Sequence, residues 1–366
     1  MIRVGIDGRE LADGVRTGIG RYLIEVLRAA SKSGVECIVY GDLNTRLPIT
    51  LPKVTLQTID SRWTQWWDQV SLPHRLARDR TSVFLSPYYK GPLFAPCPVV
   101  LTIHDLYFIQ YPRKRWPAYG ALTTVLARLY ASHAAAIIAD SEYSKRSIVE
   151  RLGVSPGKVT VIPVALGPEF KPEPLPESVA TRYGIVPPYI LYVGNFRPHK
   201  NLPRLIRAYA NLRKSLRDTY QLILAGGDRE HRQALEGLVR DLGIIDRVLF
   251  PGVIEDSHLP SVYSGCALFV LPSLEEGFGL PALEAMACGA PVVAGNRAAI
   301  PEVVAKAAIL VDPEDVPAMS EAMAEVLTVS HLRGTLRQSG LARALEFSSD
   351  RTSMRVLALL CEVCRA

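Results

Sequence analysis

Two carboxylates flank a glycine loop in the second half of the chain. Glu276 and Glu284 stand eight positions apart, and the residues between them include two glycines and a proline. Carboxylates accept paired hydrogen bonds from neighbouring hydroxyl groups, and glycines let the main chain approach a phosphate closely. This pattern predicts a clamp for a phosphorylated, hydroxyl-rich ligand. The alternatives are two carboxylates that cleave a glycosidic bond, and a lone glutamate that simply caps a helix.

The segment around this pair has the pattern of a strand, a loop and a helix. Residues 266–272 form a short apolar run, as expected of a strand buried on both faces. Pro281 suits the first helical position, where a missing N–H costs nothing, and residues 282–288 continue a buried helix with Glu284 on its first turn. In an open parallel sheet such a loop lies at the carboxyl edge of the strands, beside the positive end of a helix. Anionic ligands bind at such places.

The pattern from 271 to 302 resembles the donor-binding signature of retaining glycosyltransferases of the GT-B fold, sequence family 4 (group 1). The resemblance implies that Glu276 contacts hydroxyls of the donor hexose, near the reacting centre, and that Glu284 contacts the ribose of the nucleotide. It also implies that the intervening residues offer backbone N–H groups to the sugar and the diphosphate, namely Gly277, Phe278, Gly279 and Leu280. In this interpretation the two glutamates hold opposite ends of one donor and are not an acid/base pair.

Length and composition agree with a two-domain enzyme. The chain has 366 residues, of which 48% are apolar and 21% charged, as in folded domains with cores of their own. It opens on a strand-like run at 2–7, which differs from a secretory signal, and no apolar run approaches the roughly 20 residues that cross a bilayer. The six cysteines are scattered, so a reduced, cytoplasmic protein is expected, with a redox or metal role for the Cys361/Cys364 pair as the minor alternative.

A net charge of +6 admits nucleic acid, an anionic membrane surface or a basic ligand site as partner. The tightest basic run, 113–115, lies among aromatic residues in the segment 111–119. Basic and aromatic residues together suit a membrane interface, so this segment predicts peripheral contact with the inner face of an anionic membrane. A solvated loop whose aromatic residues pack inward is equally compatible. No recognised motif accompanies the charge, so nucleic acid is not expected.

Strand-like runs alternate with helical stretches along most of the chain, which predicts parallel sheets. In the first half the runs are 2–7, 36–40, 83–86, 98–103 and 134–139, and in the second half they are 189–193, 221–225, 247–250, 268–271, 291–294 and 308–311. Seven prolines between 163 and 188 predict a linker. The expected fold is α/β: two doubly wound Rossmann-like domains, 1–165 and 188–347, facing across a cleft, with a Pro-rich linker at 166–187. An amphipathic helix in 348–366 ends the chain, and in the resembled family the last helix crosses back to the first domain.

A basic motif follows the first strand of the second domain. Lys200 can reach a diphosphate, and the resemblance assigns a lysine at this place to the leaving nucleoside diphosphate. Members of the family often carry a second basic residue just after the glycine, where this chain has Asn195. Arg197 and His199 are the candidates to compensate. The alternative is a surface lysine at a helix start, although a cation there opposes the helix dipole.

Two motifs in the first half complete the predicted donor site. Gly18 and Gly20 follow the opening strand, but Leu23 stands where a dinucleotide fingerprint needs a third glycine, which disfavours a nicotinamide. The resemblance places this loop against the sugar and diphosphate. His104 ends a buried strand, and the resemblance assigns it to positioning the donor sugar near the reacting centre. Asp105 is expected to hold the loop by hydrogen bonds, and a purely structural histidine is the alternative.

Aromatic and amide side chains in the first domain could bind the acceptor. They fall in the segments 63–69 and 86–89, and both resemble a subset of bacterial family-4 enzymes that build surface polysaccharides, many of them mannosyltransferases. Aromatic planes and amides commonly bind sugars, but packing beneath a helix explains the tryptophans equally well. The acceptor residues therefore stay open.

These patterns and the resemblance together predict a retaining, metal-independent hexosyltransferase. It would move a hexose, with mannose favoured, from a nucleoside-diphosphate sugar to a hydroxyl of a glycan or lipid-linked acceptor, and GDP-mannose is favoured over a UDP-hexose. Base contacts are expected near Val253 and Ile254. No cofactor or metal is expected, since the sequence has no Asp-x-Asp pair of the metal-holding type. The alternatives are a sugar-nucleotide epimerase or phosphorylase of the same architecture, and a catalytically silent carbohydrate-binding protein.

Overall fold

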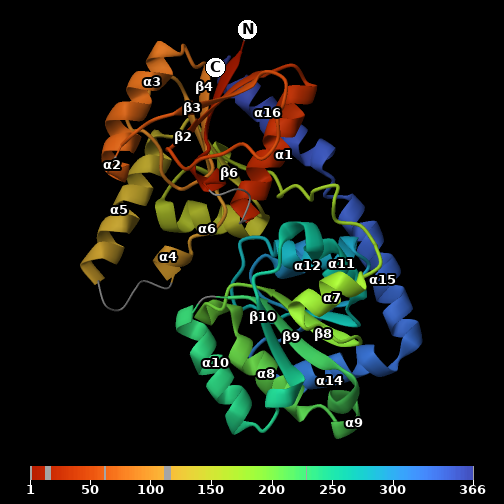
Figure 1. Cartoon of the computed structure of the whole chain (residues 1–366). Helices are drawn as coiled ribbons and strands as arrows, with labels where there is room; N and C mark the ends of the chain where they lie inside the picture. Colours follow the sequence, from red (N-terminus) through yellow and green to blue (C-terminus); the bar gives the residue numbers. More distant parts are fainter. Residues whose placement is uncertain (1, 13–17, 62, 111–116, 228, 366) are drawn as a thin grey trace. The chain divides into compact units, whose positions relative to one another are not determined.

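The computed structural model describes the whole chain except residues 1, 13–17, 62, 111–116, 228 and 366. The chain divides into two compact units (Figure 1). Unit 1 comprises Met1–Gly167 together with Ser348–Ala366, and unit 2 comprises Pro168–Phe347. The last segment of the chain is thus part of the unit that contains the first.

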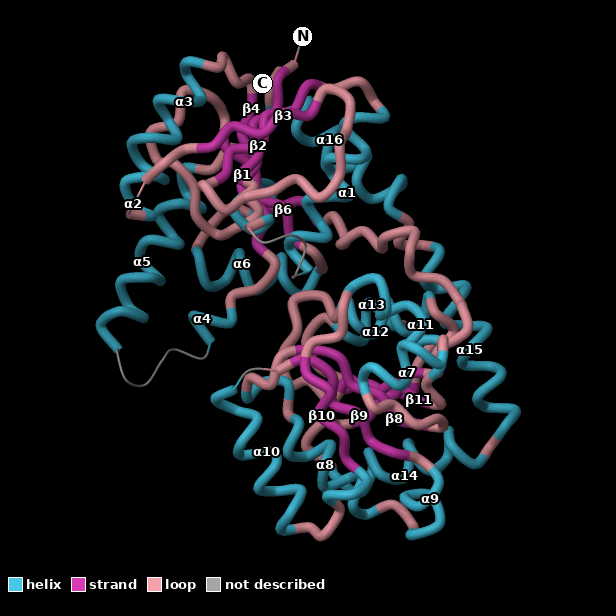
Figure 2. The backbone as a smooth tube through the Cα atoms, in the orientation of Figure 1, coloured by secondary structure: helices cyan, strands magenta, loops and turns pink. Residues whose placement is uncertain are grey.

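Unit 1 contains a parallel seven-stranded sheet of order β3-β2-β1-β4-β5-β6-β7 (Figure 2). Its central strands are apolar and buried along their whole length, as sheets covered on both faces require. Its strands are β1 (Arg3–Asp7), β2 (Glu36–Gly41), β3 (Val54–Thr58), β4 (Val83–Ser86), β5 (Val99–Ile103), β6 (Ala136–Ala139) and β7 (Val159–Val161).

Helices cover both faces of this sheet. One hydrophobic cluster contains buried residues of α3, α5 and α6 together with strand residues, so these helices pack on the same side. On the other side α1 and α16 lie side by side (Figure 1), and Lys32 on α1 pairs with Asp350 on α16 at 2.6 Å. The helices are α1 (Gly18–Lys32), α2 (Thr64–Trp66), α3 (Leu72–Arg78), α4 (Tyr107–Gln110), α5 (Pro117–His133), α6 (Glu142–Leu152) and α16 (Ser349–Val363), with short turns η1 (Arg9–Leu11), η2 (Trp67–Ser71) and η3 (Pro156–Lys158).

Unit 2 contains a parallel six-stranded sheet of order β10-β9-β8-β11-β12-β13. Its strands are β8 (Tyr189–Gly194), β9 (Gln221–Gly226), β10 (Val248–Gly252), β11 (Leu268–Leu271), β12 (Val292–Gly295) and β13 (Ile309–Val311). Its helices are α7 (Glu177–Tyr183), α8 (Leu202–Asn211), α9 (Lys214–Thr219), α10 (Arg229–Asp241), α11 (Leu259–Gly265), α12 (Leu280–Ala287), α13 (Ile300–Val304), α14 (Val316–Thr328) and α15 (Ser330–Leu345), with turns η4 (Pro198–Lys200), η5 (Ile245–Arg247) and η6 (Asp256–His258).

The structure confirms the six strands predicted in the second half and the five predicted in the first, with small shifts at their ends. It adds β3 and β7, which the sequence analysis missed. The Pro-rich segment predicted as a linker contains a helix, α7, closed by Gly184 in the left-handed region at φ 68°. None of the described helices is long and apolar enough to cross a membrane.

Candidate active site

The predicted donor residues of unit 2 gather at the carboxyl edge of its sheet. Lys200 ends the turn η4 after β8, and Glu276 follows β11, the strand hydrogen-bonded to β8. Adjacent parallel strands bring these loops together, and Lys200 Nζ lies 2.6 Å from Glu276 Oε1. Both side chains are nearly buried, with 12% and 10% of their surfaces exposed. The residues predicted to hold the diphosphate and the sugar therefore form one ion pair.

Further contacts fix this pair from the strand side. Ser273 donates its hydroxyl to Glu276 Oε1 at 2.7 Å, and the main-chain N–H of Leu274 donates to the carbonyl of His199 at 2.8 Å. His199 is buried beside Lys200, and both burial and the lysine charge lower its pKa to about 4. It is therefore a neutral imidazole at pH 7. It cannot supply the missing positive charge that the sequence analysis considered for it.

Asn201 ties three loops of this edge together. Its side-chain amide donates to the carbonyl of Pro272 at 3.0 Å and to that of Pro313 at 2.6 Å, so it links the ends of β8, β11 and β13. Its backbone is left-handed at φ 60°, a conformation that asparagine tolerates better than most residues. The residues on either side of Lys200, His199 and Asn201, are therefore both hydrogen-bonded to neighbouring loops, which fixes the loop that carries Lys200.

The glycine loop leads into α12 through a left-handed residue. Gly279 occupies the N-cap position with φ 96°, where a side chain would be strained, and it has no side chain to cap the helix itself. The start of α12 thus turns the positive end of the helix toward the sheet edge, although Pro281 has no N–H and the N–H of Ala282 donates to the carbonyl of Gly279 at 3.0 Å. Phe278 is buried and packs edge-on against Phe347, with ring centroids 5.7 Å apart, so its side chain anchors the loop.

Two details of this helix correct the prediction. The helix begins at Leu280, so Pro281 is its second residue and not its first, and no acidic residue lies in its first turn. Glu284 is therefore the fifth residue of the helix, one residue further in than expected. Its side chain is buried, and Tyr263 on α11 donates its hydroxyl to Glu284 Oε2 at 2.8 Å.

The other predicted donor residues of unit 2 are more exposed. Asn195 and Arg197 lie on the surface after β8, where the Asn195 side chain accepts the Arg197 main-chain N–H at 3.2 Å. Val253 is 77% exposed after β10, whereas Ile254 is buried. The main chains of β8 and β9 approach closely at this edge, since a Cβ on Gly226 would lie 2.3 Å from the carbonyl of Gly194. Glycine is required there for close approach of the β8 and β9 ends.

In unit 1, His104 forms a dyad with an aspartate that the sequence analysis did not identify. His104 follows β5, Asp140 follows the neighbouring β6, and His104 Nδ1 lies 2.7 Å from Asp140 Oδ2. Burial lowers the pKa of His104, but the charge and hydrogen bond of Asp140 outweigh it, so the pKa is raised above its ordinary value. Among the residues that the structure describes, the buried Nε2 of His104 has no hydrogen-bond partner. That nitrogen is left for a ligand.

The glycines predicted beside the donor belong to the same corner of unit 1. Gly18 and Gly20 form the first turn of α1 and not a separate loop. Two residues further on, Tyr22 packs edge-on against His104 with centroids 5.3 Å apart and bonds to Thr102 at 2.9 Å. The structure thus brings the glycine turn to the predicted histidine.

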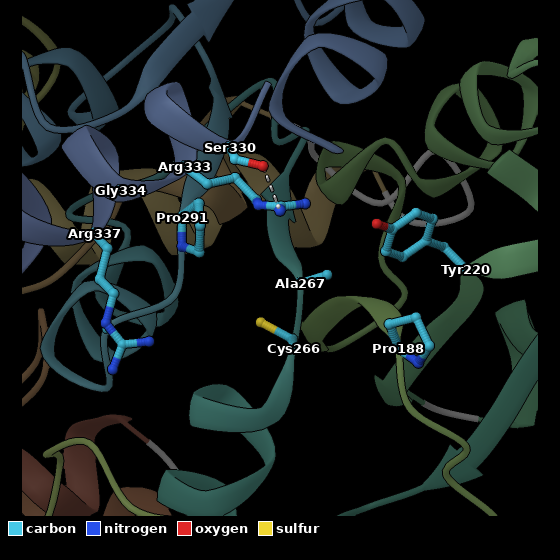
Figure 3. Close-up of a pocket in the computed structure, with 10 residues that line it drawn as sticks. Pro188, Tyr220, Cys266, Ala267, Pro291, Ser330, Arg333, Gly334 and Arg337 are labelled. Atoms are coloured by element: carbon cyan, nitrogen blue, oxygen red, sulfur yellow. Dashed lines mark hydrogen bonds between the residues drawn. The ribbon is translucent and has the colours of Figure 1, made fainter. Parts of the chain in front are cut away.

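A hollow of about 500 Å³ lies at the opposite edge of the unit 2 sheet (Figure 3). Its lining includes residues that precede strands, such as Pro188, Ala267 and Pro291, together with Arg333. Arg333 is already engaged, since it donates to the carbonyl of Leu327 at 2.9 Å and to Ser330 Oγ at 3.3 Å. Ligands of doubly wound sheets bind at the carboxyl edge, so we do not place the donor in this hollow. Among the described residues, no cluster of three or more His, Cys, Asp or Glu side chains could hold a metal ion.

Four site residues were missed by the sequence analysis: Asp140, Asn201, Ser273 and Tyr263. Two of them, Asp140 and Ser273, lie just after a strand of a parallel sheet, and this position is a usable signal for a polar residue, whereas Asn201 follows the turn η4. Tyr263 lies within a helix and carries no such signal. Its role depends on the packing of α11 against α12.

Comparisons with known proteins agree with this geometry. Residues 16–170 match the family model "Glycosyltransferase Family 4", and residues 185–342 match "Glycosyl transferases group 1". O-antigen chain mannosyltransferase B of Escherichia coli is 33% identical over 60% of this chain and 59% of that protein. A GDP-mannose-dependent alpha-(1-6)-phosphatidylinositol monomannoside mannosyltransferase of Mycolicibacterium smegmatis is 29% identical over 67% of this chain and 66% of that protein. The match thus spans less than two thirds of each relative.

A solved structure has the same fold along the whole chain. Sucrose-phosphate synthase (tll1590) from Thermosynechococcus elongatus has a TM-score of 0.80 with 21% identity, and the match covers 99% of both chains. At this identity the likeness concerns the fold alone. With the two family matches, it shows that the chain belongs to glycosyltransferase family 4 (group 1) and has the GT-B fold of two doubly wound domains.

Proposed function

We propose that this protein transfers a hexose, with mannose favoured, from a nucleoside-diphosphate sugar to a hydroxyl of a glycan or lipid-linked acceptor in the synthesis of a cell-surface polysaccharide. The observation that carries the proposal is the buried Lys200–Glu276 pair at the carboxyl edge, 2.6 Å apart, beside the start of α12. A cation, a helix N-terminus and a carboxylate together suit a ligand that has a diphosphate joined to a sugar.

Negative charge develops on the diphosphate as the glycosidic bond breaks. In this proposal Lys200 and the positive end of α12 stabilise that charge, so the reaction needs no divalent metal. The acceptor oxygen attacks the sugar on the face that the diphosphate leaves, the departing phosphate takes the acceptor proton, and the configuration is retained. No protein nucleophile takes part in this scheme.

The ion pair also makes binding and orientation interdependent. Without a donor, Lys200 and Glu276 neutralise each other, which a buried charge requires. A bound diphosphate competes for Lys200, and the hydroxyls of the sugar then satisfy Glu276. The proposed roles follow: Glu276 orients the sugar, Glu284 holds the ribose, and His104 contacts the sugar through Nε2.

GDP-mannose is the proposed donor, with UDP-hexoses as the runner-up. The support is the printed name of the mycobacterial relative, which specifies GDP-mannose, and the mannosyltransferase name of the Escherichia coli relative. We place the base near Val253 and Ile254, after β10. The order of the strands puts that loop two strands away from β8, on the same edge.

Peripheral attachment to the cytoplasmic face of an anionic membrane is part of the proposal. It is supported by the net charge of +6 and by the basic and aromatic residues of 111–119. Residues 111–116 lie outside the described structure, and α5 begins directly after them at Pro117. Co-sedimentation with phosphatidylglycerol vesicles tests it, and binding that equals that of neutral vesicles would contradict it.

The reaction itself is tested by following nucleoside diphosphate release from GDP-mannose and UDP-glucose with and without an acceptor glycan, in the presence of EDTA. The proposal predicts release that depends on the acceptor and survives EDTA. Loss of activity that magnesium restores would refute the metal-independent scheme. Turnover without an acceptor, or with phosphate as acceptor, would indicate an epimerase or a phosphorylase, and binding without turnover a silent carbohydrate-binding protein.

A further inference from the structure

Two tryptophans stand exposed at the two ends of α2 in unit 1, Trp63 as its N-cap and Trp66 as its last residue. Trp63 is 75% exposed and Trp66 is 57% exposed, whereas the next residue, Trp67, is buried. Trp63 precedes the single turn of α2 and Trp66 ends it, so the two exposed indoles stand at the two ends of one short turn. Large aromatic side chains in water are unusual in a folded domain and need an explanation.

The turn that carries them is firmly attached to the sheet. The guanidinium of Arg9 stacks on the Trp67 ring, 3.7 Å from its centroid, and donates to Asp68 at 2.6 Å and to Asp7 at 2.6 Å. Lys90 lies 3.3 Å from the other oxygen of Asp68. Trp67 and Asp68, two successive side chains of this turn, thus have defined partners.

Gln69 completes the attachment. Its amide nitrogen donates to the carbonyl of Gly91 at 3.1 Å, and its amide oxygen accepts from the main-chain N–H of Leu93 at 2.9 Å. The exposed indoles are therefore held on a rigid base. Rigidity of this kind reduces the entropy lost when a ligand binds, which favours a binding surface over accidental exposure.

The turn that carries the two tryptophans lies at the carboxyl edge of the unit 1 sheet. Asp7 is the last residue of β1, Lys90 follows β4, and Trp63 follows β3. His104 follows β5 at the same edge. In a parallel sheet all these strand ends meet at one edge, where ligands bind. A chain-like ligand at His104 can therefore extend along this edge toward the tryptophans.

The charge of this surface distinguishes between two possible ligands, an anionic membrane and a neutral sugar chain. The network around Arg9 joins two cations, Arg9 and Lys90, to the carboxylates of Asp7 and Asp68, and Tyr88 donates to the carboxylate of Glu10 at 2.7 Å. These five charged groups sum to one net negative charge. Such a surface does not attract an anionic bilayer, whereas carboxylates and exposed indoles suit a neutral, hydroxyl-rich chain.

We propose that Trp63 and Trp66 form a subsite for the sugar chain of the acceptor, away from the hydroxyl that reacts. Sugar rings pack their C–H faces on the two indoles, and Arg9, Lys90 and Glu10 bond to hydroxyls at the base. The inference rests on the proposed function, because it assigns the glycan part of the acceptor to this surface. It assigns no role to Trp67, which is buried.

Glycan binding by the full chain tests the subsite. The wild type and the Trp63→Ala/Trp66→Ala variant are applied to a panel of immobilised oligosaccharides that includes α-linked mannose chains, and affinity for the best ligand is measured by calorimetry. We expect at least about tenfold weaker binding by the double variant, as is typical when aromatic anchors of an interface are removed. A wild type that binds no glycan, or a double variant that binds as tightly as the wild type, would overturn the proposal.

A matched control comes from α5. Leu122 and Val125 are 57% and 59% exposed, so Leu122→Ala/Val125→Ala removes similar apolar surface from the same unit and should leave glycan binding unchanged. Equal loss in both variants would contradict a specific subsite. If the tryptophan variant loses binding to phosphatidylglycerol vesicles and keeps its glycans, a bilayer covers this surface and the proposal is wrong. The proposed function is tested separately, because it fails if the wild type binds no nucleotide sugar. In that case, weaker glycan binding by the tryptophan double variant than by the wild type would still support the subsite.

Discussion

The charge of His104 depends on Asp140. Burial alone lowers the pKa of the imidazole, and the carboxylate 2.7 Å from Nδ1 reverses the shift, so the pKa is raised. The stabilisation from this pair is fully present below the ordinary histidine pKa of about 6.5 and is lost as the pH rises through the higher folded value. The dyad therefore keeps the imidazole protonated to a higher pH than an ordinary histidine, with Nε2 left for a ligand.

Asp140→Asn should make the unfolding free energy fall more at pH 6 than at pH 9. We expect a loss of about 2 kcal/mol at pH 6, the size of a hydrogen bond to a charged group, and a smaller loss at pH 9. Urea unfolding at the two pH values measures it. Asp105→Asn is the comparison: Asp105 is exposed in the same loop, bonds to the Tyr107 main chain and raises the pKa of His104 less than Asp140 does, so its pH-dependent loss should be smaller. An equal loss at both pH values would contradict the charged pair.

The contribution of His199 to stability depends on pH in the opposite sense to that of His104. Its pKa is lowered to about 4 by burial and by Lys200, so the unfolded chain binds one more proton between that value and the ordinary one. The unfolding free energy should fall in that window as the pH falls, by up to roughly 3 kcal/mol from this residue. His199→Gln should reduce the acid loss, and His331→Gln, on the exposed side of α15, should not. Parallel pH profiles for the wild type and His199→Gln would exclude the assignment.

At the scale of elements, hydrogen bonds from the side-chain amide of Asn201 hold the loops after β8, β11 and β13 together. Its amide bonds to Pro272 and Pro313, and its left-handed backbone turns the chain into α8. The Lys200–Glu276 pair is formed by two of these loops. Donor affinity is therefore tied to a residue that need not touch the donor.

Asn201→Gly should destabilise unit 2 by about 2 kcal/mol, because two buried carbonyls lose their donor while glycine keeps the left-handed backbone without strain. The same variant should weaken GDP-mannose binding, since the Lys200 loop is less fixed. Chemical unfolding and calorimetry measure the two effects. Asn211→Ala, at the exposed end of α8, serves as the control. Unchanged stability would mean that the loops do not depend on this amide.

The strands that are buried on both faces could be predicted from the sequence alone. Runs such as 268–271 are apolar throughout and end at prolines or glycines, so they are recognised without any tertiary information. β3 was missed because Val54–Thr58 alternates with polar residues and is only half buried at the edge of the sheet. β7 was missed because it is short, carries a threonine at its centre and is only partly buried at the other edge of the sheet, and α7 because prolines precede and follow it.

The site was predicted in part for a similar reason. The positions of Lys200 and Glu276 after buried strands predict a shared edge, but not that the two side chains pair with each other. That pairing depends on β8 and β11 being neighbours, which the order in the sequence does not reveal. Asp140 pairs with His104 because β5 and β6 are adjacent, and Tyr263 meets Glu284 through helix packing.

At the scale of the whole molecule, α16 belongs to unit 1 although it lies at the end of the chain. Ser349 donates its hydroxyl to Glu25 on α1, and Arg355 donates to the carbonyl of Val161 at 2.8 Å. Val356, Leu357 and Leu360 on this helix are buried. Unit 1 is therefore complete only when the last helix has been made.

Leu360→Ala should destabilise unit 1 by roughly 2–4 kcal/mol, because it leaves a cavity in a buried contact. Hydrogen exchange should accelerate in α1, and exchange in α14 should not change, since α14 lies in unit 2. Leu345→Ala is the control, because Leu345 is 77% exposed. Faster exchange throughout both units would contradict two separate cores.

Calorimetric titration of Glu276→Gln with GDP-mannose and with GDP tests the central claim most directly. In the wild type, Glu276 holds Lys200 at 2.6 Å and is proposed to bind only the sugar. The variant should bind GDP-mannose at least about tenfold more weakly, through the lost charged hydrogen bond, while GDP binds no more weakly because Lys200 is freed for the diphosphate. Glu284→Gln, at the proposed ribose contact, should weaken both ligands. A wild type that binds neither GDP-mannose nor a UDP-hexose, or a Glu276→Gln variant that weakens GDP and GDP-mannose equally, would contradict the account.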